Sequence, residues 1–74
     1  MDIGKAIKEL REAAGLTRPE LAREVGMTTG ALWKIEAGKV KAKDATARKV
    51  CQRLGISYAR LVCLSLTAED FLVE

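Results

Sequence analysis

Side chains able to perform catalysis are scarce in this chain of 74 residues. It contains no histidine, the commonest general base, and Cys51 and Cys63 are its two thiols. Two cysteines without histidine cannot supply the four ligands of a structural zinc site. The acidic residues and lysines show no spacing typical of a catalytic constellation. We therefore expect no enzyme activity, no catalytic residue, no metal and no cofactor.

Basic side chains are the abundant functional groups, and they are unevenly distributed. Residues 1–55 contain 12 Lys and Arg against seven Asp and Glu, whereas residues 56–74 contain one Arg against three acidic residues. A basic body with an acidic, apolar tail suggests one surface that faces a polyanion and a separate surface that packs. On charge alone, a merely solvated cationic surface is an equally good interpretation.

The remaining composition limits the class of protein. No apolar run reaches the roughly 18 residues of a membrane span, and the N-terminus lacks the pattern of a signal peptide. Because the two cysteines do not resemble a disulfide framework, we expect a cytoplasmic protein that does not associate with membranes. Residues 1–74 are expected to form one domain, which as a monomer would bury only ~60 % of its unfolded surface and be marginally stable.

Apolar residues recur at helical spacing, and nowhere do they alternate long enough for a strand. The pattern predicts an all-α fold of five short helices with stops at Gly15, Gly26, Gly38 and Gly55. Thr17 and Glu20 have the spacing of a capping box. The predicted N-caps are Asp2, Thr17, Thr28, Asp44 and Ser57. A sixth helical turn is expected to open at Leu66 and Thr67. Cys51 is expected in the core as a small hydrophobe, and Cys63 in the core or at an interface.

Residues 18–37 contain two of these helices, joined by a tight turn. Ala22 is small where the helices would cross, and Gly26 supplies the left-handed turn four residues later. Leu32 and Ile35 then hold the angle between the helices, which is the spacing of a helix-turn-helix. The segments IKELREAAGLT, ELAREVGMTTGALWKIEAGK and VCQRLGISYARL resemble the Cro/repressor-type (XRE-like) helix-turn-helix DNA-binding family over about residues 3–64.

The resemblance assigns expected roles to individual residues. It implies that the third helix, about residues 29–37, enters the major groove of DNA. The residues expected to read bases are Thr28, Thr29, Trp33 and Lys34. Those expected to contact phosphates are Thr17, Arg18, Lys39, Lys41 and Lys43. The resemblance also implies a buried ion pair between Arg11 and Glu36.

Several residues depart from the family pattern. Gly30 stands where a polar side chain is common, and Trp33 where small polar residues are usual. We interpret the two together as an indole that lies across the room left by Gly30; a core tryptophan is the alternative. Ala42 and Asp44 also depart from the pattern, which leaves the start of the fourth helix open.

Residues 56–74 contain more apolar side chains than one face of a short helix can bury. Leu61 is sufficient to dock the fifth helix on the core. An apolar patch left exposed on a small chain usually marks a partner surface, and a two-fold pairing requires only one such patch. We therefore expect a homodimer interface containing Val62, Leu64, Leu66 and Phe71. In the alternative, residues 71–73 fold back and cover the patch within one subunit.

The expected function is a sequence-specific, double-stranded DNA-binding transcription regulator, acting as a homodimer on a pseudo-palindromic operator. The short length also resembles restriction–modification controller proteins and small phage-type repressors. An alternative is an antitoxin-type interaction module whose apolar C-terminus masks a second protein. DNA binding should require Lys34 and the lysine loop, whereas masking should require residues 66–73.

Overall fold

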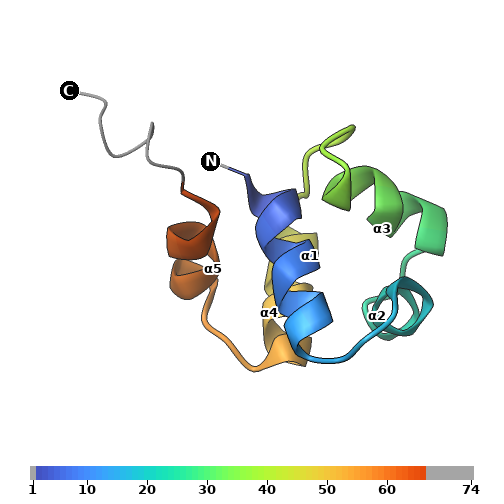
Figure 1. Ribbon diagram of the computed structural model, residues 1–74, viewed down its shortest axis with the longest axis horizontal. Coiled ribbons are helices and arrows are strands. Elements are labelled where there is room, and N and C mark those ends of the chain that lie inside the picture. The colour runs from blue at the N-terminus through green and yellow to red at the C-terminus, as the bar shows by residue number, and fades with distance from the viewer. Residues whose placement is uncertain (1, 67–74) are drawn as a thin grey trace.

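The described part of the chain, residues 2–66 of a computed structural model, contains α-helices and no strand (Figure 1). The helices are α1 (Ile3–Ala13), α2 (Arg18–Glu24), α3 (Thr29–Glu36), α4 (Asp44–Leu54) and α5 (Tyr58–Ser65). The all-α, five-helix fold class is therefore confirmed. The predicted sixth turn at Leu66 and Thr67 lies outside the described residues from Thr67 onwards. Leu66 itself is the C-cap of α5.

Four of the five predicted N-caps are confirmed. The side chains of Asp2, Thr17, Thr28 and Ser57 each accept a hydrogen bond from the backbone N–H three residues further on. At α2 the capping box is complete, because the Glu20 carboxylate also accepts from the Thr17 N–H at 3.0 Å. The Thr17 N–H and hydroxyl lower the pKa of Glu20. Local side-chain chemistry thus sets where these helices begin.

The prediction that Asp44 caps α4 is wrong. The N-cap is Lys43, which makes no side-chain capping bond, and Asp44 is the first helical residue. The Asp44 carboxylate instead accepts a hydrogen bond of 3.1 Å from the Tyr58 hydroxyl, which raises the pKa of Tyr58. Its negative charge still favours the helix from the first turn, where the helix dipole is positive.

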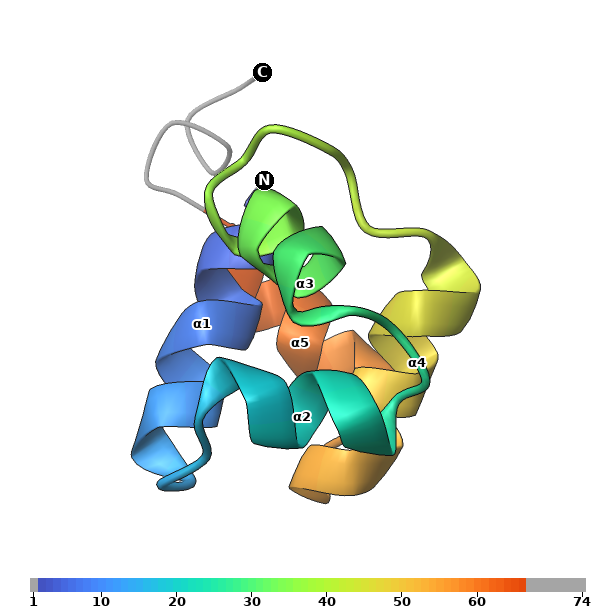
Figure 2. The same ribbon diagram turned by 90° about the vertical axis from the view of Figure 1, so that its right-hand side faces the viewer.

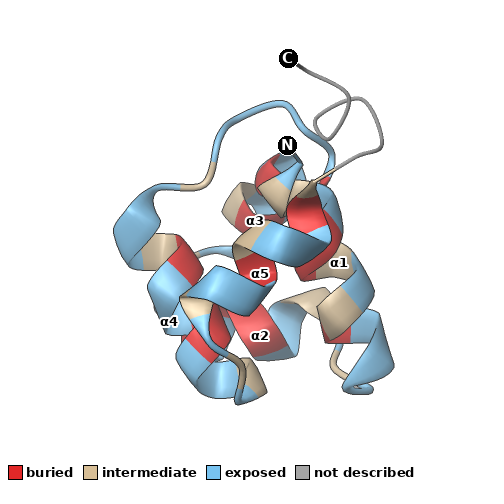
Figure 3. Ribbon diagram, turned by 90° about the vertical axis from the view of Figure 1, so that its left-hand side faces the viewer, coloured by how far each residue is buried: buried red, intermediate tan, exposed pale blue. Residues whose placement is uncertain are grey.

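The core lies where the inner faces of the helices meet (Figure 3). α1 packs against α3, α4 and α5, and α2 packs against α3. The largest fully buried side chains come from all five helices and are Ile7, Leu21, Leu32, Val50 and Leu61. Cys51 is buried among them, as predicted, and its burial raises the pKa of the thiol. Cys63, by contrast, is exposed.

The first turn of α1 lies unusually close to the end of α3. A Cβ atom added at Gly4 would overlap the backbone carbonyl of Ile35, which cannot move without displacing α3. The preceding residue is also fixed, since the Asp2 N–H donates to the Ser65 carbonyl at 2.7 Å and ties the start of α1 to the end of α5. The absent side chain at Gly4 therefore sets the distance between α1 and α3.

We expect Gly4→Ala to lower the free energy of unfolding by about 1–3 kcal/mol, the usual range for overpacking a close contact. Gly30→Ala is the matched control, because a Cβ there meets no atom within 4 Å. Alanine is the better helix former, so the control should be neutral or stabilising by about 0.5–1 kcal/mol. Urea unfolding followed by circular dichroism measures both, and equal effects would contradict the close approach.

Candidate nucleic-acid interface

The helix-turn-helix consists of α2, the turn at residues 25–28 and α3. Gly26 has a φ of 75°, the left-handed conformation that redirects the chain between the two helices. Leu32 and Ile35 bury the inner face of α3. Figure 2 views the molecule from the side of α3 that faces away from the core, and there α3 lies between α2 and the loop of residues 37–43. The outer face of α3 is therefore presented to solvent, with α2 on one side and the loop that carries Lys39, Lys41 and Lys43 on the other.

A buried carboxylate fixes the orientation of α3. The Glu36 side chain is 1 % exposed and accepts from Arg11 Nε at 2.8 Å and from Arg11 Nη2 at 3.2 Å. This is the ion pair that the family resemblance implies. Arg11 Nη1 also donates to the Leu16 carbonyl at 2.8 Å. The end of α3 is thus joined to the end of α1 and to the loop that leads into α2.

Arg18 is the third member of this network, which the sequence did not reveal. Its Nε donates to Glu36 Oε1 at 2.8 Å, although its side chain is still 33 % exposed. Arg18 therefore holds α2 on α3, in addition to the phosphate contact expected of it. With Nε directed inward, Nη1 and Nη2 remain for a second anionic partner.

The residues expected to read bases lie together on the exposed side of α3. Thr28, Thr29, Trp33 and Lys34 are all exposed. The Thr28 hydroxyl oxygen accepts from the Ala31 N–H at 3.0 Å as the cap, so its proton is the group that can be donated outward. Trp33 is 42 % exposed, which makes the alternative of a core tryptophan wrong. The Lys39 ammonium lies 5.5 Å from the centre of the indole ring.

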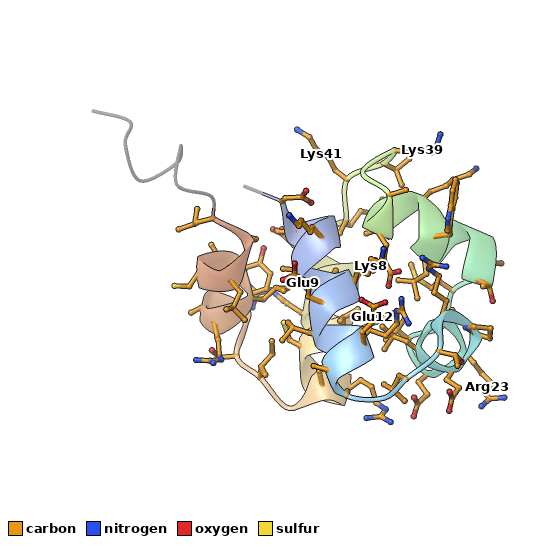
Figure 4. All side chains as sticks on the ribbon, in the orientation of Figure 1. Lys8, Glu9, Glu12, Arg23, Lys39 and Lys41 are labelled. Carbon is orange, nitrogen blue, oxygen red and sulfur yellow. The ribbon has the colours of Figure 1, made fainter. Side chains whose placement is uncertain are left out.

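The residues expected to contact phosphates lie on both sides of α3. Lys39, Lys41 and Lys43 are exposed in the loop that follows α3. Figure 4 labels the first two of them. Thr17 and Arg18 lie at the start of α2, on the other side. A groove of about 580 Å³ between α3, the loop and the start of α4 is lined by Lys34, Lys41 and Lys43 together with hydroxyl and apolar groups. Cationic groups thus border the outer face of α3.

The residues expected at a dimer interface are on a different side of the molecule. α5 lies across α1 from α3 (Figure 1). Leu61 is fully buried and docks α5, as predicted. Leu64 is 46 % exposed, and Val62 and Leu66 are half-buried. Phe71 lies outside the described residues. The interface prediction is therefore not tested by this structure of one chain.

Between residues 2 and 66, no helix combines the length and apolar character that crossing a bilayer requires. In the same range, no three Asp, Glu or Cys side chains come together as possible ligands of a metal ion.

Residues 2–62 match the family model described as a helix-turn-helix domain. Over 60 residues the chain is 37 % identical to the antitoxin PezA of Streptococcus pneumoniae serotype 4, a match that covers 81 % of this chain but only 38 % of PezA. The structure is similar to the clp gene regulator ClgR from Corynebacterium glutamicum, with a TM-score of 0.83 and 28 % identity; the match covers 86 % of this chain and 68 % of that one. The resemblance noted from the residues is thereby confirmed: the chain belongs to the helix-turn-helix domain family and has the fold of its DNA-binding regulators.

Proposed function

We propose that this chain is a transcription regulator that recognises specific double-stranded DNA by placing α3 in the major groove. The observation that carries the proposal is the division of α3 into two faces. Leu32 and Ile35 are buried, whereas Thr29, Trp33 and Lys34 are exposed. Of these three, Lys34 lines the groove together with Lys41 and Lys43. The Glu36 network holds this outer face rigidly, as a reader of base edges requires.

The position of the cations supports the same arrangement. A helix in the major groove has a phosphate backbone on each side of it. Here Thr17 and Arg18 lie on one side of α3 and the loop lysines on the other. In this proposal Thr29, Trp33 and Lys34 read bases, with the Thr28 hydroxyl, while the flanking groups fix the protein on the backbones.

Selection of bound duplexes from a random DNA pool by the purified chain tests the proposal. We expect enrichment of a pseudo-palindromic sequence whose half-sites are about one helical turn, ~34 Å, apart. A pool that remains unenriched, at a protein concentration that binds random duplex, would leave only non-specific affinity and contradict the proposal.

Substitutions can separate the residue that reads bases from the residues that contact the DNA phosphates. We expect Lys34→Ala to reduce the preference for the selected sequence by about 1–3 kcal/mol, because it removes a contact to a base edge. Lys41→Ala should weaken selected and random duplexes by the same factor, because a phosphate carries no sequence information. Titration of both duplexes with both variants measures this. If each variant loses equal affinity for the two duplexes, Lys34 does not read a base.

We further propose that two copies pair through α5. Leu64 is 46 % exposed, Cys63 is exposed, and Val62 and Leu66 are half-buried, so α5 and its C-cap leave apolar surface uncovered. A symmetric pair would bury this patch on the side away from α3, where it does not compete with DNA. Pairing would also supply core that a chain of this length lacks, so the unfolding temperature should rise with protein concentration.

Sedimentation equilibrium at micromolar concentration measures this pairing. We expect a dimer that Leu64→Glu converts to a monomer, because a carboxylate would be buried in an apolar interface. Val40→Glu is the control, since Val40 is 48 % exposed in the loop beside α3. It should remain a dimer. A monomeric wild-type chain would exclude the pairing. Dimers of both variants would mean that the interface does not include Leu64.

A second candidate function is supported by the similarity to the antitoxin PezA. In this alternative the C-terminal apolar segment, residues 66–73, masks a second protein. Native mass measurement of the chain purified from its own host distinguishes the two functions. A hetero-complex that Phe71→Glu abolishes and Lys34→Ala preserves would support masking, whereas a homodimer alone would favour the regulator.

A further inference from the structure

α3 carries a glycine that the folded chain itself does not require. Gly30 is helical and does not have a positive φ, and a Cβ added there meets no heavy atom within 4 Å. Gly4 is the contrast, because backbone of α3 occupies the space where its Cβ would be. Glycine in a helix is less stable than alanine, so Gly30 weakens α3 without relieving any contact within the chain. Its effect is a bare stretch of helix backbone on the outer face.

The expectation that the Trp33 indole lies across the room left by Gly30 is wrong, because no indole atom lies within 4 Å of the position that a Cβ would take there. Residues three apart share one face of a helix, and long helical side chains lean towards the N-terminus, so the indole borders the surface at Gly30. Trp33 is 42 % exposed, so a large part of the indole is open to solvent. Gly30 and Trp33 therefore form a notch with a bare floor and one apolar wall.

The charges around the notch limit what can occupy it. The Lys39 ammonium lies 5.5 Å from the indole centre, and Lys34 follows Gly30 by one helical turn. An apolar protein surface would bury these ammonium groups without compensation, whereas a polyanion would pair with them. The fitting occupant is therefore an apolar group carried by a polyanion. In the major groove of duplex DNA, that group is the C5 methyl of a pyrimidine.

We propose that Gly30 and Trp33 accept the C5 methyl group of a pyrimidine, thymine or 5-methylcytosine, in the DNA that the chain binds. The methyl packs against the indole, and the missing side chain at residue 30 allows the base edge to approach the helix. The inference rests on the proposed DNA-binding function and adds to it the chemical group that the unusual pair recognises.

Removing or adding one methyl group in the selected duplex tests whether the notch binds a methyl group. Deoxyuridine differs from thymidine only by the absence of the C5 methyl. We expect one thymine in each half-site at which this replacement weakens binding about fourfold, the factor for burying one methyl-sized group. At the same position, a 5-methylcytosine·guanine pair should bind about fourfold tighter than a cytosine·guanine pair. If no thymine responds, or if methylation of cytosine changes nothing, the notch does not read a methyl group.

Variants of the chain assign the effect to the notch. Trp33→Ala should bind the thymidine and deoxyuridine duplexes equally, whereas the Lys41→Ala control, which lacks only a phosphate contact, should still distinguish them. Gly30→Ala should melt at the same or a higher temperature, yet bind the selected duplex about tenfold more weakly, because its methyl group overpacks the contact. Its affinity for random duplex should be unchanged. A Gly30→Ala variant that binds the selected duplex like wild type would overturn the notch.

Failure of DNA recognition and failure of the notch give different results. If the wild-type chain enriches no duplex, DNA recognition itself fails, and the notch with it. If the chain selects a duplex in which every deoxyuridine binds like thymidine, regulation through α3 stands and the methyl-reading notch alone is overturned.

Discussion

Affinity for DNA is expected to fall by about 10³- to 10⁵-fold between 50 and 200 mM salt. Each phosphate contact releases condensed counterions, so log affinity decreases with log salt by about 0.9 per contact. Arg18, Lys39, Lys41 and Lys43 are the four candidate cations of one subunit, and all retain exposed surface. A dimer would then make about eight contacts, within the range to which this loss applies.

The slope of log affinity against log salt measures the number of contacts. Lys41→Ala should make the slope of a dimer shallower by about two contacts, one per subunit. Arg60→Ala is the control, because Arg60 is exposed on α5, across α1 from α3. A wild-type slope shallower than about −3 would exclude the phosphate contacts proposed for these four residues. An equal change of slope in the two variants would exclude the contact of Lys41.

Local features of the fold were predictable because local chemistry determines them. A hydroxyl or carboxylate at an N-cap bonds a backbone N–H only three residues away, and four such caps are where the sequence places them. The exposure of Trp33 also follows from spacing, since Leu32 and Ile35 occupy the opposite side of the same short helix. The recognition of the helix-turn-helix depended on the same short-range pattern.

Features that depend on contacts between helices were not predictable from spacing. Asp44 has the residue type of a cap, but its carboxylate bonds a tyrosine 14 positions away. Gly4 matters only because α3 passes over it. The phosphate contact expected of Arg18 follows from the family resemblance, which implies such a contact at the start of the second helix. The structure adds that its Nε bonds a carboxylate 18 residues away, which only the packing of α2 on α3 could reveal.

Loss of the Glu36 carboxylate gives the largest expected effect on stability. Glu36→Gln keeps the shape of the side chain and removes its charge, which leaves Arg11 buried without a counterion and Arg18 without its inward partner. Breaking a buried ion pair by removing one partner lowers the free energy of unfolding by about 3–5 kcal/mol. In a domain of this size the unfolding temperature should fall by roughly 12–40 °C.

Glu24→Gln provides the matched control for this prediction. Glu24 accepts from Arg53 at 2.7 Å, as short a pair as those of Glu36, but the two side chains are 38 % and 40 % exposed. Solvent screens such a pair, so its loss should change the free energy of unfolding by less than about 1 kcal/mol. Urea unfolding of both variants compares them. Similar losses would mean that burial adds nothing to the Glu36 network, and that α3 is held by apolar packing alone.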